Sequence, residues 1–141
     1  MDASPTEGAF REVEDELDAL LAAAIPDITA MGIMCTDSST RTYNYKKNYL
    51  RWESQFERRW QKDLFTQQVR IILSYGEPID PADAPRVEVF RRAESFRQDQ
   101  VSSTDEKFEE SYRIETLRAA GIADIIKSHL SAAALLLDVT L

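Results

Sequence analysis

The chain has 141 residues, enough for one domain with a single hydrophobic core and too few for two ordinary domains. Apolar residues make up 43% of the chain and charged residues 30%, a composition that excludes wholesale disorder. The net charge of −8 is spread unevenly: residues 1–40 carry −8, residues 41–70 carry +5 and residues 71–141 carry −5. We therefore expect a single domain over residues 1–141, acidic overall, with a basic middle segment that influences its choice of partner.

Cysteine content and the first residues bear on the cellular compartment. Cys35 is the only cysteine, so no internal disulfide framework can form, and a reducing compartment is the simpler expectation. Residues 1–5 lack the basic start and apolar run of a signal peptide. The most apolar stretch, residues 131–141, is far shorter than the roughly 20 residues of a membrane-spanning helix. These features predict a cytoplasmic protein that does not bind a membrane.

Residues 4–25 have the signals of an amphipathic helix. Ser4 and Glu7 form a capping box around Pro5, which suits the first helical position. Apolar residues then recur every three or four positions, as one buried helix face requires: Phe10, Val13, Leu17, Leu20, Leu21 and Ala24. Pro26 disfavours the helical conformation at Ile25, so we expect the helix to end there.

Residues 27–43 fit more than one structure. Residues 28–34 are apolar, but the run is too short for periodicity to separate a helix from a strand. Residues 36–40 have side chains that hydrogen-bond their own backbone in turns. A short β-hairpin near residues 31–45, in which 31–35 would pair with 41–45, is therefore an alternative to a short helix.

The segment from Asn44 to Tyr75 is predicted to be one long central helix. Its large apolar residues follow one another at spacings of mostly four: Tyr45, Tyr49, Trp52, Phe56, Trp60, Leu64, Ile71 and Tyr75. At ~1.5 Å per residue, roughly 30 helical residues span about 45 Å. Gly76 and Pro78 then favour termination of the helix.

A further helix is expected after the proline-containing loop. Residues 86–101 place Val89, Ala93 and Phe96 on one side of a helix, although the alternation of Val87 and Val89 also fits the start of a short strand.

The last third of the chain is predicted to be helical. Ser103 and Glu106 form a second capping box. Gly121 favours two helices that meet there, with Leu117 and Ile122 in contact. Together the segments predict an all-α bundle of four or five helices.

The sequence offers no clear catalytic or metal-ligating constellation. His129 is the only histidine and lies off the apolar stripe, so we expect a partly exposed surface residue. Cys35 has no second cysteine and no histidine in its own segment. The acidic clusters at 14–16 and 105–110 fit the solvated first turns of helices. We therefore predict no catalytic residue, no metal site, no cofactor and no enzymatic activity; a small carboxylate-based enzyme is the weaker alternative.

The basic aromatic segment, residues 41–62, is the main functional candidate. Cations interleaved with aromatic rings are one pattern of nucleic-acid binders, because cations contact phosphates and rings stack on bases. The rings share one predicted helical stripe, however, which favours a core or a protein interface with the cations as solvated flanks. The predicted partner-contacting residues are Trp52, Phe56, Trp60, Arg51, Arg58, Arg59, Leu137 and Leu141.

The expected function is a non-enzymatic interaction or assembly module, as a subunit of a homo-oligomer or of a larger particle. The predicted helix, about 45 Å long, is longer than a compact domain of this size needs. Residues 131–141 are also apolar enough to suggest a contact that holds them in place. The expected partners are proteins, including other copies of this chain. The alternative is a nucleic-acid or anion-binding module that uses residues 41–62.

Overall fold

The computed structural model describes residues 5–44, 49–76, 86–97 and 100–141. These residues form helix α1 (Pro5–Ala30), five strands, and helices α2 (Ile114–Ala120) and α3 (Ile122–Leu137). The strands are β1 (Met34–Asn44), β2 (Tyr49–Lys62), β3 (Phe65–Gly76), β4 (Arg86–Arg97) and β5 (Gln100–Arg113). The fold is therefore a helix-and-sheet fold, and the prediction of an all-α bundle of four to five helices is wrong.

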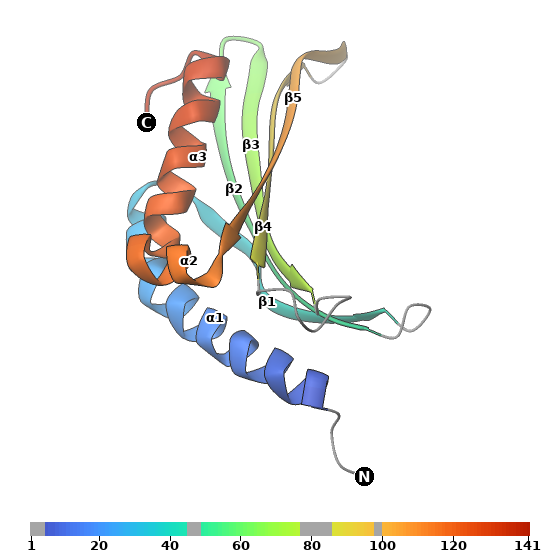
Figure 1. The fold of residues 1–141 in the computed structure, drawn as a ribbon. Coiled ribbons are helices and arrows are strands. Elements are labelled where there is room, and N and C mark those ends of the chain that lie inside the picture. Colours follow the sequence, from blue (N-terminus) through green and yellow to red (C-terminus); the bar gives the residue numbers. More distant parts are fainter. Residues whose placement is uncertain (1–4, 45–48, 77–85, 98–99) are drawn as a thin grey trace.

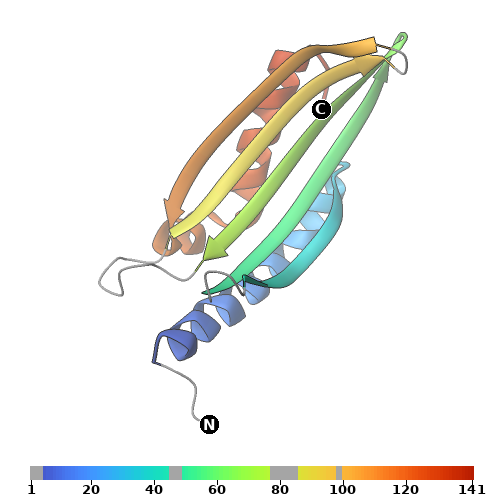
Figure 2. The same ribbon diagram turned by 90° about the vertical axis from the view of Figure 1, so that its right-hand side faces the viewer.

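The sheet is a simple antiparallel meander in the order β1-β2-β3-β4-β5. The three helices lie on one face of this curved sheet (Figure 1). α1 packs against β1 and β2, α3 packs against β3 and β4, and the two helices contact each other. A quarter turn brings the strands to the front: α3 lies behind them, and the N-terminal part of α1 extends beyond the lower end of the sheet (Figure 2). We call the face without helices the uncovered face.

The predicted long helix over 44–75 is replaced by the hairpin of β2 and β3. Trp52 pairs with Tyr75 and Phe56 with Ile71 across these two strands, and all four side chains are buried under the helices. In a strand, residues four apart lie on the same face, just as they nearly do in a helix. The spacing of four that suggested a helix is therefore also satisfied by β2.

Two other predicted helices are strands. Residues 86–101 belong mainly to β4, in which buried and more exposed side chains alternate. The alternation of Val87 and Val89 is therefore that of a strand, and it continues along β4. The segment with the capping-box pattern at Ser103 lies in β5. The hairpin proposed within residues 31–45 is also wrong, because β1 continues through residues 36–40 and pairs with β2.

α1 extends past the predicted stop at Pro26 and ends at Ala30. Gly32 follows with φ of 76°, a left-handed conformation that glycine adopts without steric cost. The guanidinium of Arg58 on β2 donates to the carbonyl of Met31 at 2.7 Å. The positive charge of Arg58 therefore stabilises the carbonyl end of α1, whose last turn contains no basic residue. The predicted cap at Ser4 lies outside the described residues.

The prediction that two helices meet at Gly121 is confirmed. Gly121 has φ of 84°, and its N–H donates to the carbonyl of Leu117 at 2.8 Å. Leu117 and Ile122 are both buried on either side of this break. α3 then runs back along the sheet, where the Gln67 amide donates to the carbonyl of Leu137 at 2.9 Å. Within the described residues, no single helix is long and apolar enough to cross a membrane; α2 and α3 pass that test only as a pair bent by 89°.

Candidate functional site

The aromatic residues predicted to contact partners lie inside the fold. Trp52 and Phe56 are fully buried between the sheet and the helices, and Trp52 donates its indole N–H to the Asp18 carboxylate on α1 at 2.9 Å. Their burial agrees with their apolar character, although they lie on a strand. Leu137 is buried as well. These three side chains therefore stabilise the chain's own core and are not presented to a partner.

Trp60 and Arg58 lie on the helix side of β2, near the end of the sheet. The Arg58 guanidinium lies 4.6 Å from the centre of the Trp60 ring, a cation–π contact. The Trp60 indole donates to the carbonyl of Thr140 at 3.2 Å. Nearby, Lys62 pairs with Asp138 at 2.9 Å. The basic residues of β2 thus hold the end of α1 and residues 138–140 against the sheet.

The outer side of α3 is a second candidate surface. Residues 128–137 contain no acidic residue, lysine or arginine, which is unusual for a chain with 30% charged residues. The solvent side of this segment presents Ser131, Ala132, Leu135 and Leu136, which we call the leucine surface. Leu135 is 85% exposed and Leu136 45% exposed. Leu141, one of the predicted contact residues, is 53% exposed.

The leucine surface was not singled out residue by residue in the sequence. Its detectable signal is that the solvent side of a surface helix ordinarily carries charged or polar residues. Here two leucines occupy that side, one turn after the small residues Ser131 and Ala132. Contiguous exposed apolar side chains of this kind mark interaction sites more often than isolated ones do.

The uncovered face of the sheet is mostly polar and carries mixed charge. Register places Glu53, Ser74, Glu88 and Ser111 in one row across four strands, and Gln55, Ile72, Phe90 and Glu109 in the next row. Charged neighbours on this face pair with each other, as Arg92 does with Asp105 and Arg59 with Glu57. Such a face is typical of an antiparallel sheet that has its other face in the core.

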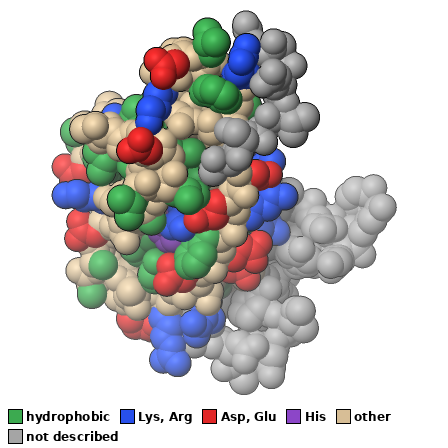
Figure 3. Space-filling view, turned by 90° about the horizontal axis from the view of Figure 1, so that it is seen from above, with side chains coloured by type: hydrophobic (Ala, Val, Ile, Leu, Met, Phe, Trp, Pro, Cys, Tyr) green, Lys and Arg blue, Asp and Glu red, His purple; other side chains and the backbone are tan. Residues whose placement is uncertain are grey.

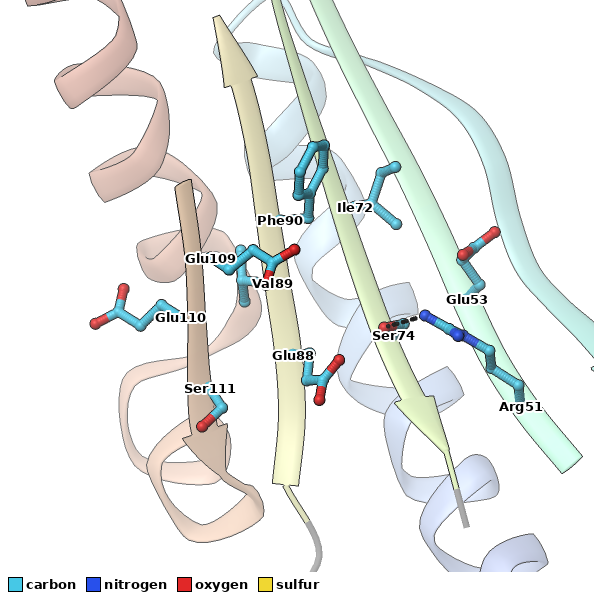
Figure 4. A pocket seen from close by; sticks show the side chains of 10 residues that line it. All are labelled: Arg51, Glu53, Ile72, Ser74, Glu88, Val89, Phe90, Glu109, Glu110 and Ser111. Carbon is cyan, nitrogen blue, oxygen red and sulfur yellow. Dashed lines mark hydrogen bonds between the residues drawn. The ribbon is translucent and has the colours of Figure 1, made fainter. Parts of the chain in front are cut away.

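A pocket of about 360 Å³ opens in this face over the two rows (Figure 4). Ile72 and Phe90 form its apolar part, and the carboxylates of Glu53, Glu88 and Glu109 line it. The guanidinium of Arg51, another predicted contact residue, reaches over β3 and donates to the Ser74 hydroxyl at 3.1 Å. Ser74 and Ser111 are small, so the longer side chains around them leave a hollow. The sequence analysis named Arg51 as a partner-contacting candidate, and it named none of the other pocket residues.

His129 is the centre of a buried polar network, so the prediction of a partly exposed histidine is wrong. Its side chain is 3% exposed, and Arg91 on β4 donates to its Nδ1 at 3.0 Å. Arg91 also pairs with Glu106 on β5 at 2.9 Å. On the other side of the ring, Nε2 lies 3.3 Å from the Tyr112 hydroxyl. Seen from above, the histidine shows as a small area among acidic, basic and apolar side chains (Figure 3).

The electrostatics of the network favour a neutral histidine. Burial, together with the Arg91 charge, lowers the pKa of His129. Because Nδ1 accepts from Arg91, the neutral ring carries its proton on Nε2, which faces Tyr112 and Glu110. Burial and the hydrogen bond to Glu110 raise the pKa of Tyr112 to about 12. With its polar atoms paired in this way, the network joins α3 to β4 and β5.

Within the part of the chain that the structure describes, no group of three or more His, Cys, Asp or Glu side chains is arranged to hold a metal ion. No family model matches this chain, and no curated protein or solved structure matches it either. A functional proposal therefore depends on the chain's own geometry.

Proposed function

We propose that this protein is a non-enzymatic interaction module that associates with a second copy of itself through the leucine surface of α3. The observation that carries the proposal is the exposure of Leu135 and Leu136 on a helix segment that has no charged residue. Moving an exposed leucine side chain out of water contributes about 1.5–3 kcal/mol. An exposed pair of this kind therefore favours association.

The leucine surface is complementary to itself. Ser131 and Ala132 leave a shallow position on α3 one helical turn before Leu135 and Leu136. In a two-fold pair of antiparallel helices, the leucines of one copy would fit over the small residues of the other. The absence of charge also matters, because two copies of a chain with net charge −8 repel each other wherever their acidic surfaces meet.

The size of the surface predicts a reversible dimer. Because Leu136 is only 45% exposed, the four leucine side chains of two copies supply about 4–8 kcal/mol on burial. Association itself costs an estimated 4–15 kcal/mol in lost translational and rotational freedom. These terms nearly cancel, so we expect a monomer–dimer equilibrium that depends on concentration. The compartment proposed for this equilibrium is the cytoplasm, in keeping with the single cysteine.

A charge introduced at the centre of the leucine surface tests the proposal. The Leu135→Glu variant should remain folded, because residue 135 faces solvent, and should have a lower weight-average mass than the native chain at the same concentration. The matched control is Thr116→Glu on α2, which adds the same charge at another exposed helical position. Light scattering coupled to size-exclusion chromatography measures both. Equal masses for the native chain and the Leu135→Glu variant at every concentration would contradict the proposal.

A nucleic-acid partner is the other class to separate. The burial of Trp52 and Phe56 gives no support to base stacking by these rings. Salt-dependent binding of single-stranded DNA or RNA that is lost in an Arg51→Ala, Arg59→Ala double variant would support that alternative instead.

A further inference from the structure

The pocket on the uncovered face has the dimensions and lining of a small-molecule site. Its volume of about 360 Å³ lies at the lower end of the range of about 300–1,000 Å³ typical of ligand pockets. Residues from β2, β3, β4 and β5 line it, so its shape is set by the register of four paired strands. It lies on the opposite face of the sheet from α3 and therefore apart from the leucine surface (Figures 1 and 2).

Arg51 in this pocket has an unused donor. Its Nε atom is buried and has no hydrogen-bond partner, whereas its Nη2 donates to Ser74. Among the described residues, no carboxylate forms an ion pair with Arg51, although Glu53 and Glu88 line the same pocket. The Nε atom lies too deep to contact a ligand directly, so the terminal nitrogens of the guanidinium are the atoms that can donate to the two oxygens of a carboxylate. The pocket therefore favours a ligand that brings a carboxylate to Arg51.

The carboxylates that line the pocket exclude a simple anion as its ligand. Glu53, Glu88 and Glu109 surround the pocket, and they outnumber the one guanidinium. Glu88 lies directly opposite Ser74 in the register, so a carboxylate and the Arg51 guanidinium approach Ser74 from neighbouring strands (Figure 4). Side chains paired in this way have Cβ atoms roughly 5 Å apart. A ligand that bridges Arg51 and Glu88 must hold a negative and a positive group close together.

The apolar part of the pocket can hold the side chain of a ligand. Ile72 and Phe90 face each other across β3 and β4, and both are half-buried. They lie in the row next to Ser74 and Glu88, so an apolar group can rest on them while charged groups lie over the first row.

We propose that this pocket binds a free α-amino acid with an aliphatic or aromatic side chain. Its carboxylate would accept from Arg51, its ammonium group would donate to Glu88 and Glu109, and its side chain would pack on Ile72 and Phe90. The inference is independent of self-association, because it uses a different face and different residues.

Isothermal titration calorimetry with phenylalanine and two blocked analogues tests the proposal on the full chain. N-acetylphenylalanine keeps only the negative group, and phenylalanine amide keeps only the positive group. We expect saturable binding of phenylalanine and at least about tenfold weaker binding of each analogue, because each loses one charge-assisted contact. The absence of saturable phenylalanine binding up to about 10 mM would overturn the proposal. Equal affinity for either analogue would also overturn it.

Variants assign the contacts. Arg51→Lys keeps the charge but loses the guanidinium fork, and Glu88→Gln removes the expected ammonium partner without changing the shape. Each should weaken phenylalanine binding by about tenfold, whereas Glu115→Gln on α2 should leave it unchanged. Melting temperatures of the variants report whether they are folded. If a folded Arg51→Lys or Glu88→Gln protein binds phenylalanine as tightly as the native chain does, the assignment of the pocket is wrong.

Discussion

Lysine substitutions at Ser54 and Gln55 test the alternation of β2 most sharply. Ser54 is fully buried on the helix side of the sheet between Trp52 and Phe56, and its hydroxyl lies 3.9 Å from the Cys35 sulfur. Gln55 is the next residue and lies on the uncovered face. In a helix whose core stripe contained Trp52 and Phe56, residue 54 would instead point away from the core. The two structures therefore predict opposite results for Ser54→Lys.

The magnitude follows from the surroundings of Ser54. An uncompensated charge placed in the core costs about 3–5 kcal/mol. Domains of this kind have a total stability of about 5–15 kcal/mol, so the Ser54→Lys variant should be barely stable or unfolded. The Gln55→Lys variant adds the same charge beside the Glu53 carboxylate and should change stability by no more than about 0.5 kcal/mol.

Urea unfolding followed by far-ultraviolet circular dichroism measures both variants. Phe56→Ala provides a second readout in case Ser54→Lys does not fold: its fully buried ring should contribute about 3–5 kcal/mol. At this chain length that loss lowers the melting temperature by about 10–15 °C. If Ser54→Lys is as stable as the native chain, or if Gln55→Lys is the more damaging substitution, the placement of β2 is wrong.

Two further predictions concern α3 and the glycines. Because the pKa of His129 is lowered in the folded state, its neutral form contributes stability that is fully present above the usual value of 6.5 and is lost as the pH falls below it. Urea unfolding at pH 7.5 and at pH 5.5, at ionic strengths matched to about 0.1 M, should show a larger loss for the native chain than for His129→Gln; equal losses would remove His129 from the explanation. Gly121→Ala should destabilise the protein by about 1–3 kcal/mol, because its φ of 84° is unfavourable for alanine. Gly8→Ala, within α1 and with open space around it, should instead stabilise by about 0.5–1 kcal/mol, and thermal denaturation that showed the same sign for both would contradict this assignment.

The helices were predictable because their signals are local. The apolar stripe of α1 and the break at Gly121 depend on residues close together in the chain, and both appear in the structure. The predicted stop at Pro26 is too early, because α1 continues through the proline to Ala30. The helix ends where Gly32 adopts a left-handed conformation and Arg58 donates a hydrogen bond to the Met31 carbonyl. The contact from Arg58 is distant in sequence and could not be anticipated.

The strands were missed because their core-facing side includes polar residues and their apolar residues recur at an ambiguous spacing. Trp52, Phe56 and Trp60 are four apart, which satisfies both a helix and a strand. Ser54 and Arg58 occupy the positions between them, so the alternation of β2 is hidden in the sequence. β3 carried a clearer signal, because Val69, Ile71, Leu73 and Tyr75 alternate and are all buried. Giving weight to β-branched and aromatic residues there would have favoured a strand.

The residues of each candidate site are brought together by the register of the paired strands. This register cannot be read from the sequence before the strand pairing is known. Arg51, Ser74 and Glu88 come from three strands and meet only because β2, β3 and β4 pair as they do. The histidine network likewise joins residues from β4, β5 and α3. Exposure of the leucine surface, by contrast, follows from helical periodicity once α3 is recognised.

Sedimentation equilibrium of the native chain tests the proposed self-association most directly. The monomer has a mass of 16.1 kDa. Across a concentration range from about 10 µM to 1 mM, the weight-average mass should rise smoothly from the monomer value toward twice that value, as a weak dimer requires. A mass that stays at 16.1 kDa over the whole range would contradict the assignment of the leucine surface as a self-association site.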